Sequence, residues 1–137
     1  MIRSVDIQIT APVYDTEITD RVKTAVTNMF PDADLEEKNS EIIGTAHSME
    51  HLSEKLHEQR ILDTARKQFF NQRRGDTFSF SLKKQAAFVD RVNFAVGEPD
   101  ELGEIYVRVR VEEPEIDEYI DMIAPQTEDG NPVTEDN

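Results

Sequence analysis

The feature that most constrains the fold is a strict alternation of apolar and polar side chains over residues 104–111. The alternating residues are, in order, Ile105, Tyr106, Val107, Arg108, Val109, Arg110 and Val111. Successive side chains of a strand point to opposite faces, so this pattern predicts a strand with one buried face. Residues 2–11 and 76–82 alternate in the same way. Because helices must cover the apolar faces, we predict an α+β fold: a single-layer, mainly antiparallel sheet with one face covered by helices, a two-layer sandwich.

Segments with helical periodicity stand between the predicted strands. The predicted helices are residues 15–30, 48–58, 60–73 and 114–123. Ser48 is a good N-cap for the second helix, and Gly75 provides a stop signal after the third. Pro114 suits the first position of the last helix, where its missing N–H would have no partner in any case.

The remaining segments are shorter or less regular. We predict a short strand at 41–47 with Gly44 as a candidate bulge. The other expectations are a weak edge strand or loop at 32–40, a turn or one helical turn at 83–87, a strand at 91–96 and a loop at 97–103. Residues 1–124 form a single α+β domain in this interpretation. Residues 125–137 lack hydrophobic content, which predicts a disordered acidic tail.

The net charge of −14 restricts the classes of ligand. Phosphate backbones and anionic membranes repel an acidic protein, so general affinity for either is not expected, and nothing points to DNA. The chain has no cysteine, no visible secretory signal and no membrane-spanning apolar stretch, so we expect a cytoplasmic protein without membrane contact. Nine Arg against six Lys on an acidic chain also suits a halophilic cytoplasm, where salt screens self-repulsion.

Residues 55–91 are the exception to this acidity. They hold nine Lys and Arg against four carboxylates, a formal charge of +5, whereas the other residues sum to −19. Phosphate binding needs several cations on one surface. The candidate anion- or RNA-binding residues are Arg66, Lys67, Arg73, Arg74, Lys83, Lys84 and Arg91. The alternative is that these side chains only neutralise nearby carboxylates, and the sequence leaves both interpretations open.

The exposed face of the predicted sheet offers a single aromatic side chain. Its residues would include Gln8, Ser79, Ser81, Tyr106, Arg108 and Arg110. Proteins that read single-stranded RNA on a sheet stack bases on several exposed aromatic rings. The alternation instead directs Phe78 and Phe80 inward, so recognition of the RRM type is not favoured.

Patterns that would indicate catalysis or a metal are weak. The segment His47-Ser48-Met49-Glu50-His51 matches the H-x-x-E-H pattern of one class of zinc protease. If Ser48 caps the helix, however, His47 lies outside the helix that would have to carry both ligands. No glycine-rich phosphate loop and no serine-nucleophile motif are present. We therefore expect no catalytic residue, no metal ligand and no cofactor.

Several segments resemble an uncharacterised archaeal protein family. They are L-H-E-Q-R-I-L-D-T-A-R (Leu56–Arg66), F-S-F-S-L-K-K-Q-A-A-F (Phe78–Phe88), R-V-N-F (Arg91–Phe94) and I-Y-V-R-V-R-V (Ile105–Val111). The resemblance covers about residues 1–124. Members of that family are similar in fold to the ribosomal protein that binds 5S ribosomal RNA. The resemblance therefore implies an α+β sandwich and, by fold analogy, RNA binding, but it assigns no catalytic or binding residues.

The sequence thus predicts a non-catalytic binding module, associated with RNA or a ribonucleoprotein through the basic segment 55–91. The alternative is a protein–protein adaptor or homodimer with no nucleic-acid role, and a metal-dependent hydrolase is the least favoured hypothesis. Convergence of the seven cations on one surface would favour RNA binding, whereas scattering among carboxylates would favour charge balancing.

Overall fold

A computed structural model of the chain describes residues 4–96, 103–128 and 131–132. Its main sheet is five-stranded and antiparallel, in the order β2-β3-β1-β5-β4. The strands are β1 (Ser4–Pro12), β2 (Asp34–Lys38), β3 (Glu41–Ala46), β4 (Thr77–Lys83) and β5 (Glu104–Glu113). The helices are α1 (Thr19–Met29), α2 (Glu50–Glu58), α3 (Leu62–Asn71), α4 (Lys84–Phe88) and α5 (Ile116–Ile123).

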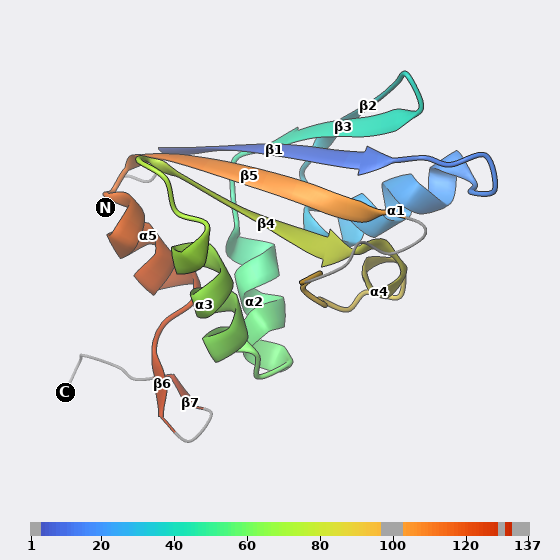
Figure 1. Cartoon of the computed structure of the whole chain (residues 1–137). Helices are drawn as coiled ribbons and strands as arrows, with labels where there is room; N and C mark the ends of the chain where they lie inside the picture. Colours follow the sequence, from blue (N-terminus) through green and yellow to red (C-terminus); the bar gives the residue numbers. More distant parts are fainter. Residues whose placement is uncertain (1–3, 97–102, 129–130, 133–137) are drawn as a thin grey trace.

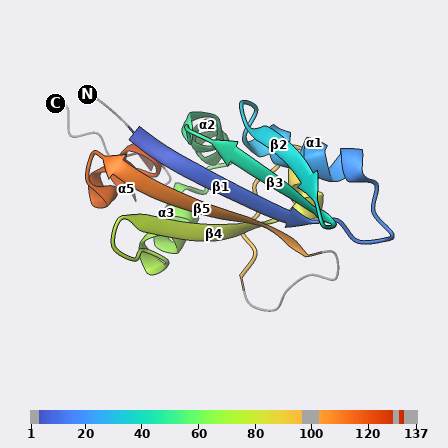
Figure 2. The same cartoon turned by 90° about the horizontal axis from the view of Figure 1, so that it is seen from above.

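All five of these helices lie on one side of the sheet (Figure 1). The view from above shows the strands in front, with no helix lying over them (Figure 2). This arrangement confirms the predicted α+β fold with one covered sheet face. We call the uncovered side the open face. None of the described helices is long and apolar enough to cross a membrane.

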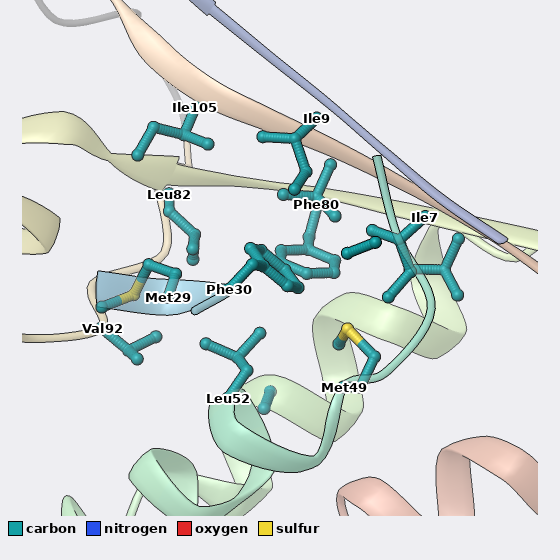
Figure 3. Packing of buried hydrophobic residues seen from close by; sticks show 14 of the residues in the cluster. Ile7, Ile9, Met29, Phe30, Met49, Leu52, Phe80, Leu82, Val92 and Ile105 are labelled. Atoms are coloured by element: carbon teal, nitrogen blue, oxygen red, sulfur yellow. The ribbon is translucent and has the colours of Figure 1, made fainter. Parts of the chain in front are cut away.

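The apolar half of each alternating strand fills the space between the sheet and the helices. Ile7, Phe80 and Leu82 point from the sheet toward Met29 and Leu52 in the helix layer (Figure 3). All five side chains are almost completely buried. Burial of a side chain of this size contributes about 1.5–3 kcal/mol, so the covered face supplies most of the stabilising contacts of the fold.

An aromatic cluster joins the helix layer to β4. The ring centroid of Phe69, on α3, lies 5.0 Å from that of Phe78, 5.0 Å from that of Phe80 and 5.9 Å from that of Phe94. These separations are in the range favoured by aromatic pairs. Phe69, Phe78 and Phe80, which are buried aromatic residues of the basic segment 55–91, therefore act as scaffold.

Residues 91–96 differ from the strand that the sequence predicts. They form an irregular segment along the edge of β4, tied to it by two backbone hydrogen bonds of 2.8 Å. Phe94 forms only an isolated bridge with Leu82. The Gln59 side chain explains the departure from a strand. Its amide oxygen accepts a 2.7 Å hydrogen bond from the Val92 N–H, and its amide nitrogen donates a 2.9 Å hydrogen bond to the Val92 carbonyl. A side-chain amide here takes the place of a strand partner.

Gly44 is not at a bulge, in contrast to the prediction. β3 pairs in unbroken register with both β1 and β2, and the register shift of the sheet lies instead between Ser4 and Val5. A Cβ atom on Gly44 would lie 2.9 Å from Cδ2 of Leu35 and 3.5 Å from Ile9. Close packing against Leu35 on the covered face therefore favours glycine at this position.

Helix ends differ from the predicted ends by a few residues. α1 begins at Thr19, later than expected. α2 begins at Glu50, one position further on than a Ser48 N-cap would place it, although the Ser48 hydroxyl still accepts a 3.0 Å hydrogen bond from the Glu50 N–H. α5 begins at Ile116, so Pro114 precedes the helix instead of occupying its first position.

The described part of the predicted tail contains a short hairpin. β6 (Thr127–Glu128) pairs with β7 (Asn131–Pro132) where a disordered tail is expected. The Thr127 hydroxyl donates a hydrogen bond to Asp63, so polar contacts order this segment despite its low hydrophobic content. Residues 129–130 and 133–137, and residues 97–102 of the predicted loop, lie outside the described residues.

Candidate nucleic-acid interface

Two of the seven predicted phosphate-binding cations, Arg66 and Arg73, form ion pairs within the protein. Arg66 Nη1 donates to Asp121 Oδ1 at 2.5 Å, and Arg73 donates to Asp117. Both guanidinium groups lie over the ring of Phe70, at 4.8 and 5.2 Å from its centroid. Arg66 connects α3 to α5, and Arg73 connects the segment that follows α3 to α5, and in both cases a neighbouring carboxylate neutralises the charge.

Lys84 is buried, and a carboxylate of the protein already neutralises its charge. Its side chain is 5% exposed, and Nζ donates to Pro12 O at 2.6 Å and to Glu17 Oε1 at 2.9 Å. Lys55, in the same basic segment, is buried in a similar way, with Nζ 2.7 Å from Asp90 Oδ1. Both lysines hold separate parts of the chain together, as the charge-balancing interpretation expects.

The other four predicted cations form no ion pair with any described residue; they are Lys67, Arg74, Lys83 and Arg91. Lys67 is exposed on α3, and Arg91 is exposed beyond the end of α4. Arg74 and Lys83 lie at the two ends of β4, because Arg74 bridges to Thr77. The structure therefore divides the seven cations between the helix layer and the sheet edge. Their role in RNA binding stays a prediction.

The open face brings together a second set of polar side chains, with Arg108 near its middle. The antiparallel register places Arg108 opposite Ser79 of β4 on one side and Gln8 of β1 on the other. Gln8 in turn lies opposite Thr45 of β3. Residues opposite one another on one face of a sheet are close enough to interact. These four side chains form a row of hydrogen-bonding groups across the sheet.

The two arginines of the open face differ in their ion pairing. Arg110 Nε donates to Asp76 Oδ2 at 3.3 Å, and Arg110 Nη1 lies 3.7 Å from Glu112 Oε1. Arg108 forms no ion pair with another residue in the described ranges, so its charge is not neutralised locally. A shallow hollow on the face is lined by Asp6, Gln8, Thr45, His47, Arg108 and Arg110.

Charge is distributed unevenly over the open face. β4 presents hydroxyls and one cation, at Thr77, Ser79, Ser81 and Lys83, whereas β5 carries Glu104 and Glu112 near its two ends. The open face of β2 carries Asp34, Glu36 and Lys38. β2 is the opposite edge of the sheet, about 19 Å from β4 at ~4.8 Å per strand. Because the Debye length is about 10 Å at 0.1 M salt, this acidic edge has little effect at β4.

The histidines of the H-x-x-E-H pattern make separate local contacts. His47 Nδ1 lies 3.2 Å from Val5 O and 3.3 Å from Asp6 Oδ1. His51 Nε2 lies 3.0 Å from Asn28 O. Among the described residues no three His, Asp or Glu side chains are grouped so as to hold a metal ion.

The fold and the open face together define a class of protein: a two-layer α+β domain whose uncovered sheet presents cationic, hydroxyl and amide side chains to solvent. The chain belongs to the archaeal UPF0201 family, and its residues 6–112 match a family model described as RNA binding. The match spans nearly the whole sheet and the first four helices.

Relatives and solved structures agree with this assignment. A UPF0200/UPF0201 protein of Archaeoglobus fulgidus is 40% identical over 97% of this chain, but the chain spans only 41% of that relative's length. A UPF0201 protein of Methanopyrus kandleri is 38% identical, with 93% of this chain and 89% of the relative covered. The crystal structure of a UPF0201 protein from Methanococcus jannaschii superposes with a TM-score of 0.86 at 37% identity, covering 94% of this chain and 99% of that one.

A more distant structure shares the fold alone. It is a DUF54 protein from Archaeoglobus fulgidus, which superposes with a TM-score of 0.63 at 20% identity and covers 92% of this chain and 99% of its own. The similarity in fold to the ribosomal protein that binds 5S ribosomal RNA stays a prediction, because the similar structures named here are UPF0201 and DUF54 proteins.

Proposed function

We propose that this protein is a non-catalytic RNA-binding protein, and that RNA contacts the β4–β5 side of its open face. The observation that carries the proposal is the match of residues 6–112 to a family model described as RNA binding. That range contains the open face almost completely, together with the cations Arg74 and Lys83 at the ends of β4.

The chemistry of Arg108 supports this choice of surface. A guanidinium group offers five donors in a planar arrangement that matches the oxygens of a phosphate. Arg108 is exposed and has no carboxylate partner among the described residues. Ser79 and Gln8, opposite it, provide neutral donors of the kind that commonly contact phosphate and sugar oxygens.

The distribution of charge explains how a protein of net charge −14 can bind a polyanion. The acidic edge strand β2 is separated from β5 by three strand spacings, about 14 Å. At salt near 0.1 M this separation exceeds the Debye length of about 10 Å. A bound backbone is therefore affected less by β2 than by β4 and β5, which carry the cations Lys83, Arg108 and Arg110 together with Glu104 and Glu112.

A titration of structured RNA against three proteins tests the proposal. They are the wild type, Arg108→Glu and the matched control Lys67→Glu, which makes the same charge change at an exposed position on α3. We expect Arg108→Glu to weaken binding at least about tenfold, because a charge-assisted hydrogen bond contributes about 1.5–3 kcal/mol. Lys67→Glu should weaken it far less. The RNA recovered afterwards should keep its original length.

Two results would contradict the proposal. If none of the three proteins binds structured RNA above the level of an unrelated acidic protein, RNA binding is excluded. If both substitutions weaken binding equally, RNA responds to net charge and the open face is not the site. Circular dichroism of each variant establishes that the fold is unchanged.

The salt dependence of binding provides an independent check. Each phosphate that a cation neutralises contributes about −0.9 to the slope of log K against log salt for a duplex. Replacement of Arg108 by Ala should therefore reduce the magnitude of the slope by about 1. An unchanged slope would mean that Arg108 contacts no phosphate.

A second candidate function, self-association, is favoured by an apolar groove between α1 and α4. Ile18, Val22, Phe88 and Val89 line it, and Ile18 and Val89 are 57% and 64% exposed. Clustered exposed apolar side chains are typical of protein contact sites. In this proposal a second copy of the chain covers the groove, and Val89→Asp converts a dimer into a monomer. Light scattering that finds a wild-type monomer at every salt concentration would exclude it.

A further inference from the structure

The side chains of the open face also discriminate between forms of RNA. We propose that the β4–β5 side of this face contacts the sugar–phosphate backbone of base-paired RNA, and that it does not bind unstacked bases of single strands. This inference rests on the proposed function and specifies its ligand.

The first observation is the small number of aromatic side chains on the open face. Among the described residues of the open face, Tyr106 is the one aromatic side chain, and it is 45% exposed. Phe78 and Phe80 belong to the covered face and pack against Phe69, with ring centroids 5.0 Å apart in each pair. They cannot turn outward without emptying the core. Single-stranded RNA is bound by stacking successive bases on several rings, and this face provides one.

The abundance of hydroxyl groups is the second observation. Thr77, Ser79 and Ser81 follow one another along the open face of β4, and Thr10 and Thr45 continue the pattern on β1 and β3. A hydroxyl both donates and accepts hydrogen bonds, so it matches a ribose 2′-OH as well as a phosphate oxygen. Double-stranded RNA is recognised mainly through these two groups, across its wide and shallow minor groove.

The arrangement of cations is the third observation. Arg74 lies beside Thr77, and Arg108 lies opposite Ser79. Lys83, opposite Glu104 of β5, ends β4, so the cations are placed along this edge with hydroxyls between them. From Thr77 to Lys83 the strand spans about 20 Å at ~3.3 Å per residue. Residues 91–96 hold this edge with two backbone hydrogen bonds of 2.8 Å. An edge strand whose backbone is held in place before binding suits a duplex, whose phosphates also have set positions.

The experiment measures binding of three ligands to the 137-residue chain at one salt concentration: an RNA hairpin, a DNA hairpin of the same sequence and an unstructured RNA of equal length. We expect the RNA hairpin to bind at least about tenfold more tightly than the unstructured RNA. Tyr106→Ala should change hairpin affinity less than about twofold, because loss of a stacked base would cost about fivefold to 150-fold. We expect the wild type to bind the RNA hairpin about fivefold more tightly than the DNA hairpin, the change in affinity that one hydrogen bond produces. The double variant Ser79→Ala/Ser81→Ala should bind the two hairpins equally.

The outcomes separate this inference from the proposed function. If the unstructured RNA binds as tightly as the hairpin, and Tyr106→Ala abolishes that binding while Arg108→Glu weakens it, the protein is an RNA binder that uses stacking and the inference is wrong. If the serine double variant keeps the full preference for RNA over DNA, the proposed contacts between the serine hydroxyls and the ribose 2′-OH groups are excluded. If no ligand binds, the proposed function fails together with the inference.

Discussion

The two faces of the sheet come from the same strands and carry opposite chemistry. In β5, Val107 and Val109 are completely buried, whereas the adjacent Tyr106 and Arg108 are exposed. β4 repeats the contrast, because its phenylalanines pack into the core and its serines face outward. Helices cover only the first face (Figure 1). Stability therefore depends on one set of alternate residues and the proposed RNA contact on the other, so that each can be changed separately.

The largest effect in this comparison is expected from Phe80→Ala on the covered face. Phe80 is 3% exposed and packs against Phe69 and Phe94. Truncation of a buried Phe leaves a cavity, and we expect the free energy of unfolding to fall by about 3–5 kcal/mol. Denaturation by urea, followed by circular dichroism, measures the change.

The matched control is the next residue of the same strand. Ser81→Ala changes only the open face, and substitutions of this kind usually shift the free energy of unfolding by less than about 0.5 kcal/mol. Equal losses for Phe80→Ala and Ser81→Ala would contradict the division between a stabilising face and a contact face.

A loss of stability at the low end of the same range is expected for Lys84→Met, because Glu17 keeps the hydrogen bond that it accepts from the Tyr14 N–H. The substitution leaves the Glu17 carboxylate, whose side chain is 11% exposed, without its cation. Breaking a buried ion pair from one side costs about 3 kcal/mol or more. Thermal and urea unfolding measure the loss, with Lys67→Met on the exposed side of α3 as the control. Weaker RNA binding by folded Lys84→Met, without a loss of stability, would instead favour its predicted role as an anion ligand.

Gly44→Ala tests how closely the covered face is packed against β2. The new methyl group would lie 2.9 Å from Leu35 Cδ2, the end of a half-buried side chain that can move. We expect a loss of about 1 kcal/mol, at the low end of overpacking costs. In a Leu35→Ala background the same change should cost less, and a double-mutant cycle measures the difference. An equal cost in both backgrounds would exclude Leu35 as the cause.

The smallest effect is expected for the ion pair between α3 and α5. Arg66 is 20% exposed and Asp121 is 56% exposed, at an N–O distance of 2.5 Å. Exposed pairs contribute less than about 1 kcal/mol, and salt weakens them. A cycle of Arg66→Ala and Asp121→Ala should therefore give a small coupling energy in low salt and almost none in 1 M salt. A coupling that persists in 1 M salt would indicate a pair shielded from solvent.

The sequence predicted the inward and outward residues of β1, β4 and β5 correctly, because these depend only on local alternation. It failed at residues 91–96, where the decisive partner is the distant Gln59 side chain. It also did not select Arg108, the residue on which the proposed function rests. The outward position of Arg108 was predictable from the pattern, but its place between Ser79 and Gln8 required the order of strands in the sheet.

The basic segment shows most clearly which properties follow from the sequence and which follow from the tertiary structure. The sequence by itself determined the excess of positive charge in residues 55–91 and the inward direction of Phe78 and Phe80, since the first follows from composition and the second from short-range periodicity. Only the tertiary structure decided which of those charges are neutralised. Arg66 finds Asp121 across 55 positions of the chain, and Lys84 finds Glu17 across 67. Electrostatic pairing depends on distance in space, and spacing along the sequence does not encode that distance.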